Sequence, residues 1–426
     1  MGRAEHRSFP ERETHCRSGG LRLVNPQAAR GRRPRVAIVT HELTGGVGTM
    51  TRFLYRVLSE SGRYEPGVIS LATSARDTAG TMVRKPWTWL AAPRVIRGED
   101  RGMPYAHIGA RFTEIEYQRY RPRDVLDREL AAYDIIQFVA GAAPWVEAAA
   151  AIPKPKCLWV ATTIVGDRTG RTGTPLTLRK IWSAIMTRYA CRYEERALKR
   201  ADAILALSPY TVRSLAPLVD KEVTLAPCGV DTSMFRPAGN KNADRYILCV
   251  ARLFDPRKNV SMLLRAYSSL AQRNPHIPDL VLVGEPLSPE GTALLTKLGI
   301  ADRVRLVGPT HGDALAETYR GAMMFVLPSD EEGLGIVILE AMATGLPVVS
   351  TACGGPETAV IEGVTGYLTP VRDQAAMERA MEKLIGDAAL RDSLGRAGRR
   401  VAEEKFSIEA TGQVFLDQYS AFIGSP

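Results

Sequence analysis

The stretch that decides the fold follows the apolar run Met324–Leu327. It reads Pro328-Ser329-Asp330-Glu331-Glu332-Gly333-Leu334-Gly335-Ile336-Val337-Ile338-Leu339-Glu340-Ala341-Met342. An apolar run, a loop with two glycines and an apolar helical sequence predict a strand, a loop and a helix in direct succession. The first turn of such a helix presents free backbone N–H groups, so an anion or a sugar hydroxyl can bind there.

The same unit recurs along the chain. Near the start, Val36–Val39 is followed by a predicted glycine-rich loop, Gly45-Gly46-Val47-Gly48, and by a helical pattern through Phe53, Leu54 and Val57. Further apolar runs alternate with helical sequence at Gly67–Leu71, Asp134–Val139, Cys157–Ala161, Ala203–Leu207, Tyr246–Val250, Leu280–Val283, Val304–Val307 and Pro347–Ser350. Their continuous apolarity favours parallel strands covered by helices on both faces, and hence an α/β fold.

The length of 426 residues and a polar turn sequence at Phe235–Asn240 predict two domains. We expect two Rossmann-like, doubly wound domains that face each other across a cleft, with ligands at the carboxyl ends of the strands. The predicted parts are a disordered basic tail at 1–33, an N-terminal domain at 34–236, a C-terminal domain at 244–405, and a helix at 406–423 that crosses back to the N-terminal domain.

Composition excludes several classes of protein. The net charge is +10, but residues 1–35 hold nine Arg and three Glu, so six of these charges lie in this N-terminal stretch and do not indicate nucleic-acid binding. The tail lacks the apolar core of a secretory signal, and no run of about 18 apolar residues predicts a membrane span. The six cysteines show no CxxC spacing, which argues against zinc and suits a reducing cytoplasm.

Two cations follow the strand Tyr246–Val250 in the sequence Val250-Ala251-Arg252-Leu253-Phe254-Asp255-Pro256-Arg257-Lys258-Asn259. An Arg can contact two phosphate oxygens at once, and a Lys supplies a mobile point charge. Arg252 and Lys258 therefore suit a diphosphate. The alternative is a solvated basic loop.

Two carboxylates, Glu332 and Glu340, are eight residues apart. If both lie on a helix they are separated by up to about 12 Å, whereas a glycosidase pair needs roughly 5–9.5 Å. They suit different parts of one elongated ligand. The alternatives are a helix-start carboxylate for Glu332 and an exposed helix residue for Glu340.

Beyond the tail, the sequence resembles the retaining glycosyltransferases of family 4, which have the two-domain GT-B fold and a Glu-x7-Glu motif. The motifs that carry the resemblance are Gly45–Gly48, Ala203–Ser208, Pro227–Asp231, Arg252 with Lys258, Val283–Pro286, Glu332 with Glu340, and Gly354–Glu357. The resemblance implies a sugar transfer from a nucleotide-diphosphate sugar, as substrate and without a further cofactor, to a sugar, lipid-linked or small-molecule acceptor.

The resemblance also implies that the domain at 34–236 is the acceptor side and that the domain at 244–405 binds the nucleotide sugar. By this resemblance, Arg252 and Lys258 hold the donor diphosphate and Glu340 the ribose hydroxyls. Glu332 holds the transferred sugar. Gly46 approaches the phosphates from the other domain. The alternative interpretation of Gly46 is a plain tight turn. Backbone amides that contact the sugar come from Gly333, Leu334, Gly335 and Ile336.

The sequence departs from the family pattern twice. Arg252 and Lys258 are six residues apart rather than five, so Arg257 could share the phosphate role. Many members also place a histidine near the sugar after a mid-domain strand, and neither Gln137–Ala140 nor Ala161–Thr163 contains one. His41, which follows the first strand, is a candidate catalytic residue, with a structural histidine as the alternative.

The resemblance also implies a front-face mechanism in which the leaving phosphate takes the acceptor proton. The sequence contains no Asp-x-Asp pair of the kind that metal-dependent transferases use, so we do not expect a catalytic metal. The alternatives are a nucleotide-sugar epimerase or hydrolase of the same fold and a non-catalytic binding protein. The basic helical sequence Leu178–Arg200 has two interpretations: an exposed helix, or a peripheral contact with the inner face of the membrane.

Overall fold

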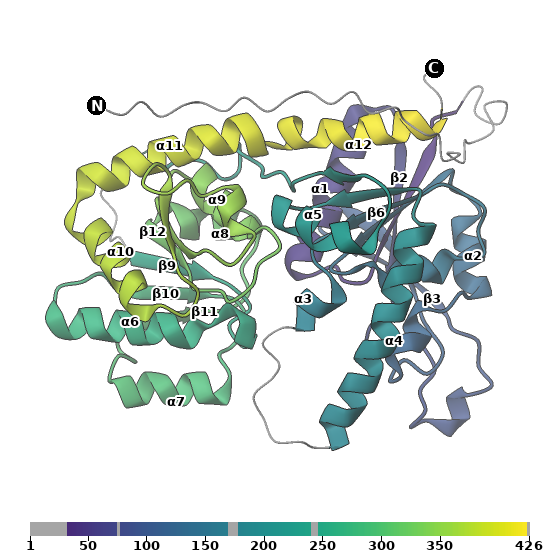
Figure 1. Ribbon diagram of the computed structural model, residues 1–426, viewed down its shortest axis with the longest axis horizontal. Helices are drawn as coiled ribbons and strands as arrows, with labels where there is room; N and C mark the ends of the chain where they lie inside the picture. Colours follow the sequence, from purple (N-terminus) through teal and green to yellow (C-terminus); the bar gives the residue numbers. More distant parts are fainter. Residues whose placement is uncertain (1–31, 75–76, 169–177, 240–245, 424–426) are drawn as a thin grey trace.

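The computed structural model describes residues 32–74, 77–168, 178–239 and 246–423. It has two α/β domains that lie side by side (Figure 1), and the predicted fold class is confirmed. The predicted tail lies almost entirely outside the described residues. Arg32, which the sequence assigns to the tail, forms an ion pair with Asp134 at 2.9 Å. At residue 32 the chain therefore already contacts the N-terminal domain.

The described part of the N-terminal domain contains an eight-stranded sheet in the order β3-β4-β2-β1-β5-β6-β7-β8. Its strands are β1 (Arg35–Thr40), β2 (Glu65–Leu71), β3 (Val95–Asp100), β4 (Met103–Ile108), β5 (Ile135–Ala140), β6 (Lys156–Val160), β7 (Ala203–Ala206) and β8 (Val223–Leu225). All neighbouring pairs are parallel except β3 and β4, which form an antiparallel hairpin at the edge.

The C-terminal domain has, within the described ranges, a six-stranded parallel sheet in the order β11-β10-β9-β12-β13-β14. Its strands are β9 (Tyr246–Val250), β10 (Leu280–Val283), β11 (Val304–Val307), β12 (Ala322–Leu327), β13 (Val348–Thr351) and β14 (Gly366–Thr369).

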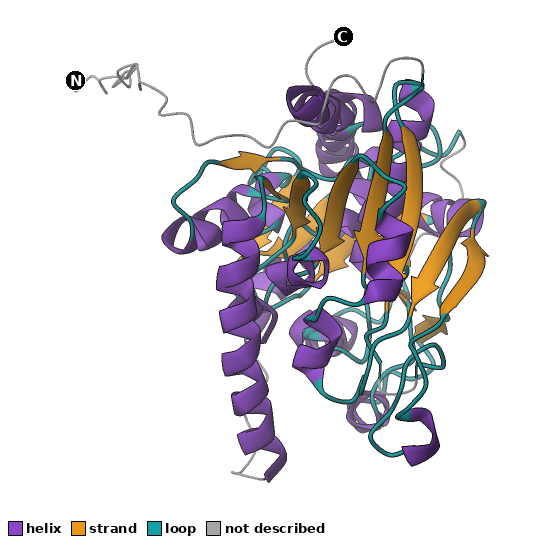
Figure 2. Ribbon diagram, turned by 90° about the vertical axis from the view of Figure 1, so that its right-hand side faces the viewer, coloured by secondary structure: helices purple, strands orange, loops and turns teal. Residues whose placement is uncertain are grey.

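Helices cover the sheets (Figure 2). Those of the N-terminal domain are α1 (Gly45–Ser61), α2 (Asp124–Leu130), α3 (Ile164–Arg168), α4 (Leu178–Arg200) and α5 (Pro209–Leu215). Those that follow are α6 (Val260–Arg273), α7 (Pro289–Leu298), α8 (Gly312–Arg320), α9 (Ile336–Ala343), α10 (Gln374–Gly386), α11 (Ala388–Phe406) and α12 (Ile408–Ile423). Among the described residues, none of the helices is both long enough and apolar enough to cross a membrane.

One local expectation was wrong. Gly45–Gly48, which the sequence predicts as a loop, forms the first turn of α1. Gly48 is packed so closely that a Cβ there would lie 2.2 Å from the carbonyl oxygen of Leu43. Here glycine permits close contact between the loop and the helix rather than a break in the helix.

Both faces of the central strands are buried in each sheet, which explains why these strands are largely apolar. In β1, Val36 and Ile38 join one core cluster while Ala37 and Val39 join another. The first cluster also contains residues of the C-terminal sheet, and a third lies on the other face of that sheet.

Helix α12 packs on the N-terminal domain although it follows the C-terminal domain in sequence, and Figure 1 shows α11 and α12 along one side of both domains. The Phe415 ring lies 4.7 Å from Trp159 and 5.9 Å from Phe53, measured between ring centroids. The Tyr419 hydroxyl donates a hydrogen bond to Gln137 Oε1 at 2.7 Å. These buried contacts join the end of the chain to the first domain.

We predict that Phe415→Ala lowers the stability of the protein strongly. The side chain is fully buried between two aromatic rings, and removal of such a side chain costs about 3–5 kcal/mol. Urea denaturation followed by tryptophan fluorescence checks this. Glu409→Ala, at an exposed position of the same helix, is the control. Equal unfolding midpoints for the two variants would contradict a structural role of this contact.

Candidate active site between the two domains

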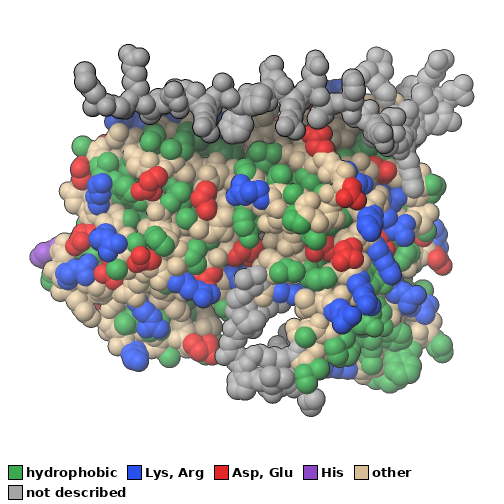
Figure 3. All heavy atoms as spheres, in the orientation of Figure 1, with side chains coloured by type: hydrophobic (Ala, Val, Ile, Leu, Met, Phe, Trp, Pro, Cys, Tyr) green, Lys and Arg blue, Asp and Glu red, His purple; other side chains and the backbone are tan. Residues whose placement is uncertain are grey.

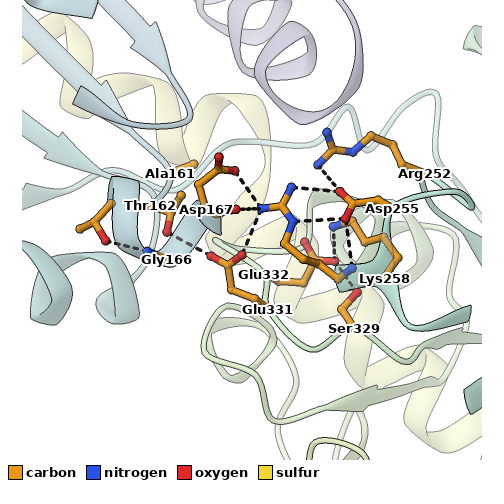
Figure 4. A network of polar contacts seen from close by, with 12 residues as sticks. Ala161, Thr162, Gly166, Asp167, Arg252, Asp255, Lys258, Ser329, Glu331 and Glu332 are labelled. Atoms are coloured by element: carbon orange, nitrogen blue, oxygen red, sulfur yellow. Dashed lines mark hydrogen bonds and ion pairs between the residues drawn. The ribbon is translucent and has the colours of Figure 1, made fainter. Parts of the chain in front are cut away.

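The predicted donor-site residues lie where the strand order of the C-terminal sheet reverses. The chain passes from β9 to β10 and β11 on one side and then returns to β12 on the other. At such a reversal the loops after the two central strands diverge and leave a crevice at the carboxyl ends. The loop after β9 carries Arg252, Arg257 and Lys258, and the loop after β12 carries Glu331 and Glu332. Figure 4 shows the two loops meeting.

Lys258 and Glu332 form the direct link between these loops. Lys258 Nζ lies 2.7 Å from Glu332 Oε1, which also accepts a hydrogen bond from Ser329 Oγ at 2.7 Å. Asn259 follows Lys258 in a left-handed conformation, with φ of 44°, and begins α6. An asparagine tolerates this conformation better than most residues. The resulting turn directs the Lys258 side chain toward the second loop.

Arg252 makes a weaker contact on the same side. Its guanidinium lies 3.2 Å from Asp255, and its side chain is 37% exposed. Asp255 also caps the short 3-10 helix Pro256–Lys258, because its side chain accepts a hydrogen bond from the Arg257 amide. The Arg252 side of this pair is exposed and Asp255 keeps Arg257 as a second partner, so an incoming phosphate can replace Asp255 at low cost.

Arg257 is held much more firmly than Arg252. It contacts Asp255 at 3.0 Å, Glu331 at 3.2 Å and Asp167 of α3 at 2.9 Å (Figure 4). Burial alone would lower the pKa of Arg257, but these carboxylates together hold it above its usual value. Asp167 belongs to the N-terminal domain, so Arg257 connects the two domains.

The contact between domains continues from Glu331. Its Oε1 accepts a hydrogen bond from Thr162 Oγ1 at 3.1 Å. A Cβ on Gly333 would lie 2.7 Å from the carbonyl oxygen of Ala161. This is the segment after β6 in which the expected family histidine is absent. Here Ala161 and Thr162 contact the glutamate loop directly.

The N-terminus of α9 faces the same region. Gly335 caps the helix with φ of 79°, a conformation that favours glycine, and Ile336 begins it. Leu334 is buried and anchors the turn in the core. The free backbone N–H groups at this end attract negative charge and can donate hydrogen bonds to hydroxyl oxygens.

Glu340 is buried, which excludes the alternative of an exposed helix residue. The Tyr319 hydroxyl donates a hydrogen bond to Glu340 Oε2 at 2.7 Å. Burial raises the pKa of Glu340 to about 7, although this hydrogen bond and the charge of Arg52 act in the opposite direction. Arg52 comes from α1 and pairs with Asp100 at 2.9 Å. A residue of the N-terminal domain therefore influences the second glutamate of the motif.

His41 lies at the reversal point of the other sheet, where β1 and β5 are neighbours. Its ring stacks on Trp145 with 4.8 Å between centroids, and its Nδ1 is buried without a hydrogen-bond partner among the described residues. Burial lowers the pKa of His41 to about 4, against a smaller attraction from Asp167. His41 is therefore neutral at pH 7 and a weak base.

Gly46 lies in the first turn of α1, and a Cβ there would meet no atom within 4 Å. The described protein atoms do not demand glycine at this position. The open space is compatible with a ligand that approaches the backbone closely.

A cavity of about 600 Å³ lies at the carboxyl ends of β1, β2 and β4. It is lined by His41, Glu42, Leu43, Thr44, Ser70, Leu71, Thr73, Tyr105 and His107. His107 Nε2 lies 2.7 Å from Asp77 Oδ2, and its Nδ1 lies 3.2 Å from Ser70 Oγ. Burial alone would raise the pKa of Asp77, but His107 and backbone amides hold it below its usual value. In the described ranges, no group of three or more His, Cys, Asp or Glu side chains could hold a metal ion.

Sequence reasoning missed the partners of the predicted residues. Asp167 and Glu331 hold Arg257, while Tyr319 and Arg52 set the environment of Glu340. Glu331 stands beside Glu332 in the motif, and this adjacency was an available signal. The other three residues lie far from the motif in sequence, and no local pattern marks them.

We predict that Glu340→Gln stabilises the unliganded protein at high pH. The pKa is about 4.5 in the unfolded chain and about 7 in the folded protein, so the folded state holds more protons between these values. Wild-type stability therefore falls as pH rises through this window, by roughly 2–3 kcal/mol from this residue. Urea titrations at pH 5, 6, 7 and 8 measure the difference, with Glu409→Gln as a control for loss of a surface charge. Parallel curves for wild type and Glu340→Gln would contradict the assignment.

Comparison with known proteins identifies the family. Residues 44–234 match the model of Glycosyltransferase Family 4, and residues 231–401 match that of Glycosyl transferases group 1. The D-inositol 3-phosphate glycosyltransferase of Salinispora tropica is 34% identical over 53% of this chain and 52% of its own length. That of Geodermatophilus obscurus is 36% identical over 54% of each chain. The chain thus spans about half the length of the curated relatives it matches.

Solved structures agree on the fold. The sucrose-phosphate synthase of Thermosynechococcus elongatus superposes with a TM-score of 0.71 and 22% identity, over 91% of this chain and 100% of that one. The Anabaena protein HepE in complex with UDP and glucose gives a TM-score of 0.68 and 16% identity, over 91% and 99%. By its consecutive family matches and its two-domain architecture, this chain belongs to the GT-B glycosyltransferases of family 4.

Proposed function

We propose that this protein is a retaining glycosyltransferase that takes its sugar from a nucleoside-diphosphate sugar. The observation that carries the proposal is the meeting of Arg252, Lys258, Glu332 and the N-terminus of α9 at the strand-order reversal of the C-terminal sheet. Cations and free amides together suit a diphosphate, and a carboxylate beside them suits sugar hydroxyls. Family membership and the UDP complex of a protein with this fold support the same donor class.

Donor binding requires an exchange of partners. Arg252 and Lys258 now contact Asp255 and Glu332. A diphosphate brings more negative charge than one carboxylate, so it competes for both cations. When Lys258 turns to the phosphate, Glu332 is released for a hydroxyl of the transferred sugar. Arg257 has three carboxylate partners and stays in its structural position.

The chemistry follows from the growth of charge on the leaving group. As the anomeric bond breaks, the nucleoside diphosphate gains negative charge, which Arg252 and Lys258 stabilise without reorganisation. His41 has a pKa of about 4 and is a poor acceptor for the proton of the attacking hydroxyl. The departing phosphate oxygen is a better acceptor. If it takes the proton, the hydroxyl attacks on the face from which the phosphate leaves, and the anomeric configuration is retained.

The cavity at the carboxyl ends of β1, β2 and β4 is the proposed acceptor site. Its hydroxyl, imidazole and carboxylate groups can form hydrogen bonds with a polyhydroxylated acceptor. The relatives named above act on an inositol phosphate according to their names, so a cyclic polyol is a suitable first acceptor to assay.

We predict that incubation with a matching nucleotide sugar and acceptor yields a glycoside with the anomeric configuration of the donor, also in the presence of EDTA. Proton NMR of the product reads the configuration from the anomeric coupling constant. Reactions without acceptor separate the alternatives, since an epimerase or hydrolase converts the donor alone. An inverted product, or activity that EDTA abolishes and magnesium restores, would contradict the proposal.

We predict that Arg252→Ala and Lys258→Ala each lower kcat more than they raise KM for the donor. A lost charge contact to the leaving group raises the barrier by roughly 2–4 kcal/mol, or about 30- to 1,000-fold in rate. Arg257→Ala is the matched comparison from the same loop. It should lower the melting temperature, because buried carboxylates lose their counter-charge, while kcat falls less. Near wild-type turnover by folded Arg252→Ala and Lys258→Ala would sink the assignment.

A further inference from the structure

Three of the five tryptophans of the chain are exposed, and all three lie in two segments of the N-terminal domain. Trp87 is 78% exposed and Trp182 is 52% exposed, whereas Trp145 and Trp159 are buried in the core. Soluble proteins rarely leave several large aromatic side chains in water at one end of a domain. Such a cluster indicates a surface that contacts something else.

The first segment surrounds the 3-10 helix Pro86–Thr88. Leu90 is fully exposed, and Val83 and Trp89 are partly exposed beside it. The segment is anchored from the inside: the Trp89 indole N–H donates to the carbonyl oxygen of Met82 at 3.0 Å, and its ring packs edge-on against Phe112. This anchoring holds Trp87 and Leu90 outward.

The second segment is the first half of α4. Four large side chains are exposed on this part of the helix: Ile181, Trp182, Ile185 and Tyr189. The last three follow Ile181 by one, four and eight positions, which places all four on one face of the helix. The side of the helix next to this face carries the buried residues Met186 and Ala190. This part of α4 is therefore apolar on the core side and also on the outer side, which packing within the domain does not explain.

Cations accompany both segments. Arg84, Lys85 and Arg94 are exposed around the first, and the sequence between Thr78 and Gly98 contains no Asp or Glu. On α4, exposed Arg188, Arg192 and Arg196 continue the outer face beyond its apolar part. The apolar side chains thus lie toward the start of the helix, and the arginines lie further along it.

The two segments lie at the same end of the molecule. Figures 1 and 2 show the start of α4 and the short helix after β2 both at the lower end of the N-terminal domain. Figure 3 shows hydrophobic side chains gathered in this region with Lys and Arg side chains beside them. We name the exposed residues Val83, Trp87, Trp89, Leu90, Ile181, Trp182, Ile185 and Tyr189 the docking face.

We propose that the docking face binds the surface of an anionic lipid bilayer. The apolar side chains enter the region between headgroups and acyl chains, where tryptophan is especially favourable, and the surrounding cations contact lipid phosphates. The cationic border distinguishes this face from a purely apolar protein interface. The sequence alone suggested the α4 contact; the structure adds the Trp87 segment at the same end and so defines a surface with two contact points.

Co-sedimentation of the full chain with vesicles tests this proposal. Wild type should bind vesicles that contain 30 mol% phosphatidylglycerol, bind phosphatidylcholine vesicles at least tenfold more weakly, and show blue-shifted tryptophan fluorescence when bound. Trp87→Ser with Leu90→Ser should lower the partition coefficient at least tenfold, because neither side chain is held in the core. Arg84→Ser with Lys85→Ser should lower it by about fivefold per cation.

The controls replace exposed residues elsewhere on the molecule. Leu306→Ser with Val364→Ser tests loss of exposed apolar groups, and Arg396→Ser with Arg400→Ser tests loss of exposed cations, all in the C-terminal part of the chain. Both should bind vesicles as wild type does. Trp87→Ser with Leu90→Ser should also keep wild-type turnover on a soluble acceptor, so this test is independent of the proposed activity.

Two outcomes overturn the proposal. The first is absence of wild-type binding to the anionic vesicles. The second is binding that the docking-face variants and the control variants retain equally. A concentration-dependent dimer in sedimentation velocity that Trp87→Ser with Leu90→Ser abolishes, without any vesicle binding, would assign the face to a second copy of the chain instead.

Discussion

The pairing of basic and acidic side chains between the loops after β9 and β12 is the interaction on which the site depends. Lys258 meets Glu332, and Arg257 meets Glu331, so two consecutive cations contact two consecutive carboxylates across the strand-order reversal. The two ion pairs differ in how firmly their cations are held. Arg257 also reaches Asp167 of the other domain and is held in place, whereas Lys258 and Arg252 have partners that a diphosphate can replace. The Arg257 pair belongs to a contact between the domains, and the Lys258 pair belongs to the proposed donor site.

The parallel strands and the donor loops could be predicted from the sequence because their signals are local. Strands buried on both faces are apolar throughout, as β10 and β12 are, and the glycine-containing turn before α9 identifies a helix N-terminus. The β3–β4 hairpin escaped prediction because no residue of β3 is buried and three of its six residues are charged. Asp167 and Arg52 escaped because their importance comes from contacts between distant segments. The placement of the Trp87 segment at the same end of the N-terminal domain as the start of α4 likewise depends on the tertiary fold.

The N-terminal domain holds His41 at one edge of its sheet and packs against α12 elsewhere. At the carboxyl ends of β1 and β5, His41 is kept neutral by burial against Trp145. On another side, α12 returns from the C-terminal domain and buries Phe415 and Tyr419. This return ties the two domains together at a second place, away from Arg257.

The most direct test of the account is the thermal stability of the full chain in the presence of nucleoside diphosphates. A ligand that binds only the folded state stabilises it by about 1.4 kcal/mol for each tenfold rise in concentration above its Kd. The account predicts that at least one nucleoside diphosphate raises the melting temperature of wild type in this logarithmic manner, and that Arg252→Ala and Lys258→Ala shift the response to higher concentrations. If every nucleoside diphosphate leaves the melting temperature unchanged, or if both variants respond as wild type does, the donor site is not at the junction of β9 and β12.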